Sequence, residues 1–209
     1  MLTVILIVLA VGLQTPAASH ATDPHEGRFT AGLGVACAYC HDPTDWKSTS
    51  RPPFDMAARM SKMVASLNIG PLRPYGGVSC LTCHRGATKP ARLPQASLES
   101  AAAKWPASLD LGEDAAKKRA REVYSDVQVL GAADAGSIKT SMVLYSASLG
   151  ARCERCHAAT GDWAAERKIK RTARVMQTMM AELPTYFDNT RTPVFQCFSC
   201  HQGATKPKR

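Results

Sequence analysis

The sequence is poor in the residues that usually build a hydrophobic core, a disulfide framework or a histidine-based active site. Aromatic residues make up only 6% of the 209 positions, and no cysteine lies outside one repeated short motif. Only His20 and His25 lie outside that motif, so the sequence shows no cluster of acid–base groups. The apolar run from Leu2 to Leu13 is shorter than the roughly 20 residues that cross a bilayer. A disulfide-stapled domain and a membrane-spanning anchor are therefore both disfavoured.

All eight cysteines occur in four copies of Cys-x-x-Cys-His, the pattern of covalent haem attachment. Two thiols three residues apart lie on one face of a helical turn, where they reach the two vinyl groups of one porphyrin. The next histidine is then the fifth ligand of the iron. A redox dithiol or a zinc site also uses Cys-x-x-Cys, but neither explains a histidine directly after every pair. The sequence therefore predicts four haem c groups.

The four motifs are numbered here in chain order, and each supplies two cysteines and one histidine. They are motif 1 (Cys37, Cys40, His41), motif 2 (Cys80, Cys83, His84), motif 3 (Cys153, Cys156, His157) and motif 4 (Cys197, Cys200, His201).

The chain is basic, with 26 Lys and Arg against 17 Asp and Glu and a formal charge of +9. Such a balance by itself suggests a nucleic acid, an anionic membrane or an acidic partner. Each haem brings two propionates, however, so four haems add about −8 and nearly cancel the excess. No nucleic-acid partner is therefore expected. The basic run at 166–171 is interpreted as a solvated helix face, with a docking patch for an acidic partner as the alternative.

Residues 1–21 are interpreted as a signal peptide that directs export to the periplasm. Small residues follow the apolar run, and they fit cleavage after Ser19 or Ala21. A retained membrane anchor is the alternative, but the run is short for a span. No cysteine directly follows the run, so a lipid anchor at that position is not expected. We expect a periplasmic protein that lies free or peripherally on the membrane.

The chain is an internal duplication. The first cysteines of motifs 1 and 3 are 116 residues apart, and those of motifs 2 and 4 are 117 apart. The sequence Gly-Ala-Thr-Lys-Pro also occurs twice, at 86–90 and at 203–207. The predicted organisation is a dihaem module at 22–95, a connector at 96–117 and a second dihaem module at 118–209.

The predicted fold is a mostly α multihaem c-type cytochrome built from two duplicated dihaem modules with little β structure. Residues 55–67 and 170–183 place apolar side chains at helical spacing and contain no internal glycine or proline. The alanine- and serine-rich residues 91–117 are interpreted as a surface segment. The other expected elements are a short charged helix at 113–125, a brief strand at 127–130 and a helix at 138–149.

The sixth iron ligands decide what each haem does, because methionine raises its reduction potential and a second histidine lowers it. Two methionines recur on the helices between the motifs, Met60 with Met63 and, 116 residues later, Met176 with Met179. Methionine at helical spacing more often fills a core, so we expect one of each pair to face a haem and the other to pack.

The haem of motif 1 has no methionine candidate at the position where motif 3 has one. Met142 lies eleven residues before Cys153, and the equivalent position before Cys37 holds Glu26. The adjacent His25 is the predicted sixth ligand, because no strong helical pattern in 20–28 holds the register and a shift of one residue would bring the imidazole over the iron. A free surface histidine is the alternative.

Two stretches resemble the tetrahaem cytochrome subunit of photosynthetic reaction centres. One runs from Glu122 to Leu130 and continues through Met142 to motif 3, and the other runs from Ala57 to Met60 and continues at 77–86. In that family a helix with the sixth-ligand methionine precedes the motif that it serves. The resemblance therefore implies that the methionine ligands are Met60, Met142 and, by the repeat register, Met176.

The resemblance also implies a function, which is electron transfer and not substrate turnover. The acceptor would be the photo-oxidised bacteriochlorophyll pair of a reaction centre, and the donor a small soluble periplasmic carrier. Another membrane redox complex is the alternative partner. The alternative function is a respiratory multihaem cytochrome in which the haem of motif 1 is open and reduces peroxide or a nitrogen oxide. Neither 61–79 nor 177–196 contains the histidine that the family commonly uses for a bis-histidine haem.

Overall fold

The computed structural model describes residues 24–158, 161–188 and 193–208, and the predicted signal peptide lies outside this part of the chain. Within it the regular structure consists of α-helices and short 3-10 helices, and only isolated β-bridges occur, at Asp42–Asp45 and Arg119–Asp134. The expectation of a mostly α fold is confirmed. No helix in these described ranges has the length and apolar character that a membrane crossing requires.

The α-helices of the described ranges are α1 to α9 in chain order. They are α1 (Pro24–Leu33), α2 (Pro52–Ile69), α3 (Cys80–His84), α4 (Gln95–Ala102), α5 (Glu113–Lys117), α6 (Ala120–Val123), α7 (Gly136–Leu149), α8 (Lys168–Glu182) and α9 (Cys197–His201). The 3-10 helices that concern the site are η1 (Cys37–Tyr39), η4 (Cys153–Arg155) and η5 (Leu183–Tyr186).

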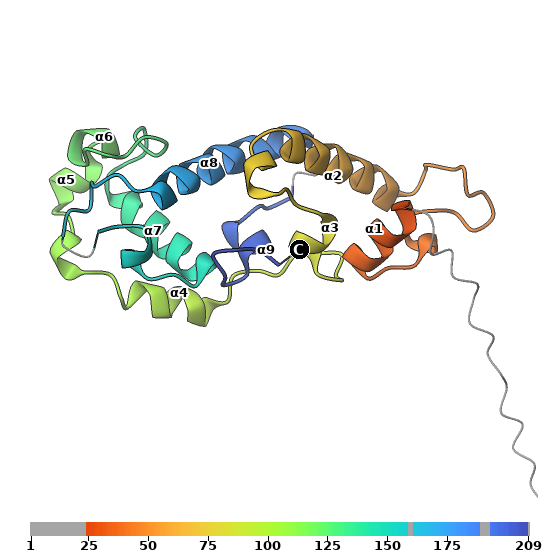
Figure 1. Cartoon of the computed structure of the whole chain (residues 1–209), viewed down its shortest axis with the longest axis horizontal. Helices are drawn as coiled ribbons and strands as arrows, with labels where there is room; N and C mark the ends of the chain where they lie inside the picture. Colours follow the sequence, from red (N-terminus) through yellow and green to blue (C-terminus); the bar gives the residue numbers. More distant parts are fainter. Residues whose placement is uncertain (1–23, 159–160, 189–192, 209) are drawn as a thin grey trace, which may run out of the picture.

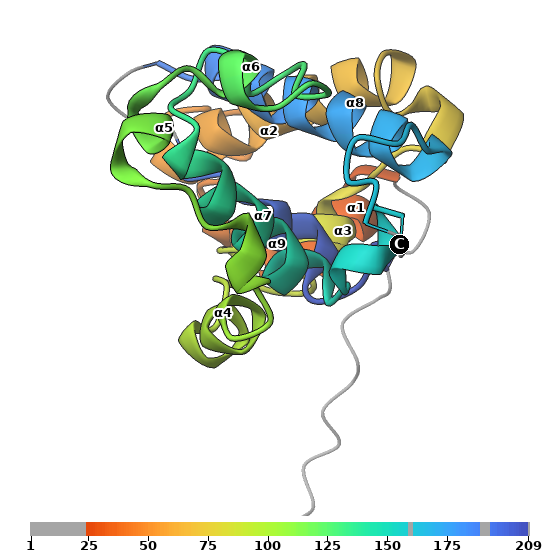
Figure 2. The same ribbon diagram turned by 90° about the vertical axis from the view of Figure 1, so that its left-hand side faces the viewer.

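The helices form two layers in an elongated molecule. Helices α1, α3, α9 and α7 follow one another along one side, and α2 and α8 run along the other (Figure 1). The view along the molecule shows the same two layers (Figure 2). The haem motifs all belong to the first layer, because motifs 2 and 4 are α3 and α9 and motifs 1 and 3 directly follow α1 and α7.

Helices α2 and α8 confirm the two helices predicted from apolar spacing, and they meet in the main core of the protein. Met63 and Leu67 of α2 are buried there with Met179 of α8 and Leu183 of η5. The Tyr186 hydroxyl also hydrogen-bonds to Ser66 Oγ at 2.6 Å. This core joins the two modules, because one side of it comes from each half of the chain.

The predicted helix at 138–149 is confirmed as α7, whereas the connector is more than a surface segment. Part of the connector forms α4, which packs on α7 and buries Ala101 against Val143 and Ala147. Trp105 packs at the edge of this second cluster. The alanines that made the segment look like a linker are the small side chains that let two helices approach closely.

Two predictions for residues 113–130 are wrong. The single charged helix is split into α5 and α6, because Lys118 and Arg119 are extended between them. The backbone of 118–120 pairs instead with a later loop, through Ala120 N to Ala133 O at 2.8 Å and Ala135 N to Lys118 O at 2.8 Å. Residues 127–130 form no strand, and 129 and 130 lie in a turn. Tertiary hydrogen bonds outweigh local propensity here.

The expectation that no strong helix holds the register of 20–28 is also wrong for its described part. Helix α1 starts at Pro24, so His25 and Glu26 lie in its first turn. The helix packs against α3, and a Cβ built on Gly32 would lie 2.7 Å from Cys80 Cβ. The first module therefore has a leading helix in the same place as α7 in the second, stabilised by a tertiary contact that apolar periodicity does not report.

Candidate haem-binding motifs

Each motif is a single tight turn that brings its two cysteines and its histidine together. In motifs 1 and 3 the first cysteine begins the 3-10 helix η1 or η4, and the second cysteine directly follows that helix. The backbone N–H of the histidine donates to the carbonyl of the first cysteine, His41 N to Cys37 O at 3.0 Å and His157 N to Cys153 O at 2.9 Å. Motifs 2 and 4 are the five-residue helices α3 and α9. Both forms give the arrangement predicted for attaching one porphyrin through two thiols.

The histidine rings of three motifs are oriented by a backbone carbonyl. The Nδ1 atoms of His84, His157 and His201 lie 2.9 Å from the oxygens of Ala87, Trp163 and Ala204, respectively. An Nδ1–H that donates to a carbonyl leaves Nε2 with its lone pair free for a metal. Burial lowers the pKa of His84 and His201, which keeps these imidazoles neutral. The donor set therefore fits a haem iron.

The surroundings of the cysteine thiols differ, because a hydrogen bond with Cys83 lowers the pKa of the Cys200 thiol. Burial raises the pKa of the thiols of Cys40, Cys80, Cys156 and Cys197. A zinc site or a redox dithiol uses the thiolate form. Burial thus disfavours, at these four cysteines, the thiolate form that either alternative requires.

In each module a glycine before the outer motif lies in direct backbone contact with a glycine after the inner motif. A Cβ on Gly34 would lie 2.1 Å from Gly86 O, and a Cβ on Gly150 would lie 2.2 Å from Gly203 O. Gly34 and Gly150 also have positive φ, +65° and +56°. These contacts fix the outer motif of each module against the inner one, and no residue with a side chain fits there.

Motifs 2 and 4 meet at the centre of the molecule and are related by an approximate two-fold axis. Cys83 Sγ and Cys200 Sγ are 2.7 Å apart. Gln202 Nε2 donates to Cys83 O at 3.3 Å, and Arg85 Nη2 donates to Cys200 O at 3.4 Å, so equivalent positions reach across in opposite directions. The order of the motifs along the molecule is therefore 1, 2, 4, 3, which Figure 1 shows as α1, α3, α9 and α7.

A comparison with known families matches nearly the whole described chain. The family model described as "Photosynthetic reaction centre cytochrome C subunit" matches residues 28–104 and 93–209. The chain belongs to this family. Each match contains one pair of motifs, in agreement with the internal duplication, and the second match begins two residues before α4. The protein is thus a c-type cytochrome that binds haem c, and its role is electron transfer.

The predicted methionine ligands on α2 and α8 are less buried than the second methionine of each helix. Met63 and Met179 are buried in the α2–α8 core, whereas Met60 and Met176 are half-buried at its edge. Met142 is half-buried on α7. Ligation by Met60, Met142, Met176 and His25 stays a prediction, and the burial of Met63 and Met179 agrees with the packing role expected for them.

Two arginines of the cytochrome were missed by the motif analysis. Arg51 Nη1 donates to Ala38 O and to His41 O, the latter at 3.1 Å. Arg167 Nη1 donates to Glu154 O at 3.0 Å and to His157 O at 2.7 Å. Each guanidinium thus holds the carbonyls of an outer motif. The signal was in the sequence, because Arg51 and Arg167 are 116 residues apart.

Proposed function

We propose that this cytochrome binds four haem c groups in one line and passes electrons along them. The observation that carries the proposal is the order of the motifs, because the helices that carry or directly precede them contact one another in the order α1, α3, α9 and α7. A one-electron carrier works by short steps between adjacent centres, and a linear arrangement connects two distant partners through such steps.

The residues divide the work of holding each haem. The two cysteines of a motif anchor the porphyrin through thioethers, and the histidine binds the iron. When bound, each iron takes up and releases one electron, at a potential that the sixth ligand shifts. Met60, Met142 and Met176 are the proposed sixth ligands for motifs 2, 3 and 4, and His25 for motif 1. The carbonyls of Ala87, Trp163 and Ala204 hold the imidazoles in the ligating tautomer.

We place the protein in the periplasm, exported by residues 1–21, as the subunit that reduces the photo-oxidised bacteriochlorophyll pair of a reaction centre. The family membership supports this partner, and the electrons would come from a small soluble carrier. The chain then acts as a carrier between proteins and not as an enzyme.

The cofactor count is tested first, by mass spectrometry of the mature protein. The mass should equal the polypeptide without residues 1–21 plus four haems, and the pyridine haemochrome spectrum should show two thioether links per haem. A mass with fewer haems contradicts the four-haem line, and a zinc or disulfide mass overturns the haem assignment as a whole.

The partner is tested by flash spectroscopy. Reaction centres lacking a cytochrome subunit are mixed with the reduced protein, and re-reduction of the bleached bacteriochlorophyll pair is followed after a flash. We expect fast re-reduction that depends on the cytochrome and is lost when it is omitted or oxidised beforehand. Re-reduction no faster than with a small chemical donor would remove the reaction-centre role while leaving electron transfer intact.

A further inference from the structure

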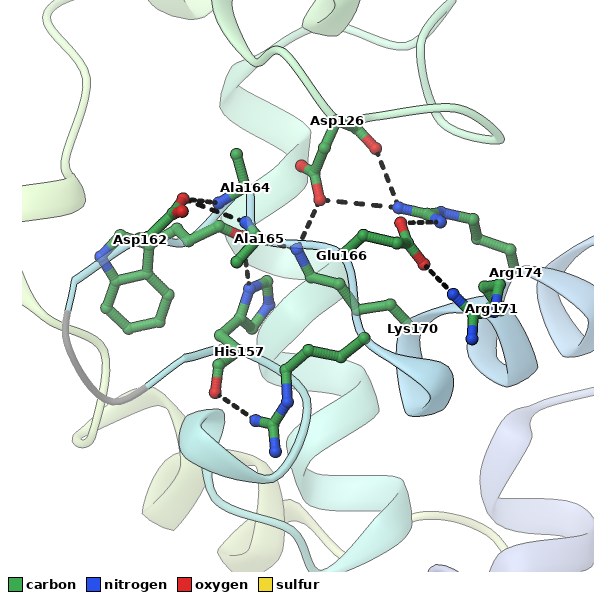
Figure 3. Close-up of polar contacts among 11 residues, drawn as sticks. Asp126, His157, Asp162, Ala164, Ala165, Glu166, Lys170, Arg171 and Arg174 are labelled. Atoms are coloured by element: carbon green, nitrogen blue, oxygen red, sulfur yellow. Dashed lines mark hydrogen bonds and ion pairs between the residues drawn. The ribbon is translucent and has the colours of Figure 1, made fainter.

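A network of charged side chains lies on one side of His157 (Figure 3). Lys170 Nζ lies 2.5 Å from Asp126 Oδ2, and Arg174 Nη2 lies 3.6 Å from the same oxygen. Arg174 also pairs with Glu166 at 2.7 Å, and Arg171 pairs with Glu166 at 3.7 Å. Three cations therefore face two carboxylates beside motif 3. The predicted solvated face at 166–171 is wrong at Lys170, whose side chain is only 8% exposed.

Lys170 is connected to His157 through a single atom. Its Nζ donates to Trp163 O at 2.6 Å, and His157 Nδ1 lies 2.9 Å from the same oxygen. The indole of Trp163 also contacts the imidazole, with ring centroids 5.2 Å apart. A buried cation and the imidazole N–H thus share one carbonyl acceptor.

The first module has a different residue at the position equivalent to Lys170. The position 116 residues before Lys170 is Phe54. Its ring packs edge-on against the His41 imidazole, with centroids 5.4 Å apart. A neutral hydrocarbon therefore stands beside the histidine of motif 1 where motif 3 has an ammonium group. The two outer motifs share their backbone but differ in the charge next to the iron ligand.

The positive charge of Lys170 would shift the reduction potential of a bound haem in one direction. A strong acceptor for the Nδ1–H makes an imidazole more anionic, which stabilises ferric iron. An ammonium that donates to the same carbonyl makes that carbonyl a weaker acceptor for the Nδ1–H. Its positive charge in a poorly solvated site also favours the reduced haem, which is the less positive form. Asp126 offsets only part of this charge, because it is shared with Arg174.

We infer that Lys170 is a positioning residue that acts through the Trp163 carbonyl and His157 and raises the reduction potential of the motif 3 haem. The inference rests on the proposed binding of haem at Cys153 and Cys156. It gives the two ends of the molecule different potentials by a means other than the sixth ligand, and so gives the line of haems a preferred direction.

The test is a spectroelectrochemical titration of the holo-cytochrome carrying Lys170→Met, which removes the charge but keeps an apolar stem of similar length. One of the four haem components should move to lower potential, so that its ratio of reduced to oxidised form at the wild-type midpoint falls several-fold. A tenfold fall corresponds to about 59 mV for a one-electron couple. The ferric electron paramagnetic resonance signal of that one haem should change as its histidine gains anionic character.

Three further variants separate the electrostatic role from a structural one. Lys168→Met removes the same charge from the exposed start of α8 and should leave the four components nearly unmoved. Lys170→Arg keeps the charge and should restore the wild-type potential. Asp126→Asn removes the counter-charge and should move the same component upward, which also tests the inference if Lys170→Met fails to fold.

Results that contradict the role of Lys170 differ from results that contradict the proposed function. Equal shifts in Lys168→Met and Lys170→Met, or an upward shift in Lys170→Met, would overturn the role of Lys170 while the haem count stands. A wild-type mass that lacks the motif 3 haem would instead contradict the proposed function.

Discussion

The two modules have the same backbone around their motifs and different surroundings for their outer histidines. In both, a leading helix packs on the inner motif, a glycine pair closes the turn, and an arginine holds the carbonyls of the outer motif. The His41 ring contacts the aromatic rings of Trp46 and Phe54, whereas the His157 ring hydrogen-bonds to a carbonyl that also accepts from Lys170.

The features that the modules share belong to the backbone or hold it in place, whereas the features that differ are side chains beside the iron ligands. The modules share the geometry needed to bind a porphyrin, and the loss of one of these contacts would prevent haem binding. What differs is the charge beside a ligand, which changes the potential of a haem without moving the backbone. A duplicated carrier gains from this separation, because equal haems at both ends would give electrons no preferred direction.

The largest expected effect tests whether the glycine contacts are equivalent. Gly34→Ala and Gly150→Ala should each destabilise the holoprotein by roughly 2–5 kcal/mol, because the new Cβ meets a carbonyl oxygen and φ is positive. Denaturant unfolding measures the loss. Gly86→Ala is the matched control, since its φ is +82° but its Cβ meets nothing within 4 Å, so only the backbone strain of roughly 1–2 kcal/mol remains. Unequal costs at Gly34 and Gly150 would break the equivalence of the modules.

The methionines test the register of the two long helices. Met60→Leu or Met176→Leu should each remove part of the near-infrared sulfur-to-iron band and lower the potential of one haem, because the thioether ligand is lost. Met63→Leu and Met179→Leu keep the buried volume and should leave the band nearly unchanged. Met142→Leu should act like the first pair. If the buried pair abolishes the band and the first pair does not, the register is wrong by one turn.

The sixth ligand of motif 1 is the sharpest difference expected between the modules. Wild-type ferrous protein should bind little carbon monoxide, and His25→Ala should bind about one equivalent per chain, because the iron loses its imidazole ligand. Glu26→Ala in the same turn of α1 is the control and should bind no more than wild type. Binding of one equivalent by the wild type would show an open site and favour the small-molecule reductase instead.

The arginines should give the smallest effect, again equal in both modules. Arg51→Ala and Arg167→Ala each remove two hydrogen bonds to carbonyls of an outer motif, but both side chains are exposed. We expect about 1 kcal/mol of lost stability for each in denaturant unfolding. A fall in the potential of one haem with Arg167→Ala alone would extend the electrostatic difference beyond Lys170.

The cofactor, the duplication and the long helices could all be predicted from the sequence. Haem attachment depends on local spacing, because five consecutive residues carry both thiols and the iron ligand. The helices α2, α7 and α8 follow from apolar periodicity. The repeat also pairs Met60 with Met176, since an offset of 116 residues is a property of the sequence alone.

Long-range contacts decided what the sequence did not show. The break between α5 and α6 comes from hydrogen bonds to Ala133 and Ala135, and α4 is ordered by its packing on α7. Lys170 looks like any lysine in a basic run, and only the fold buries it between Asp126 and the Trp163 carbonyl. The order 1, 2, 4, 3 likewise follows from the contact between α3 and α9 at the two-fold axis. Local spacing thus determines which cofactor the chain binds, whereas the neighbours of each haem and the charges beside it depend on residues that only folding brings together.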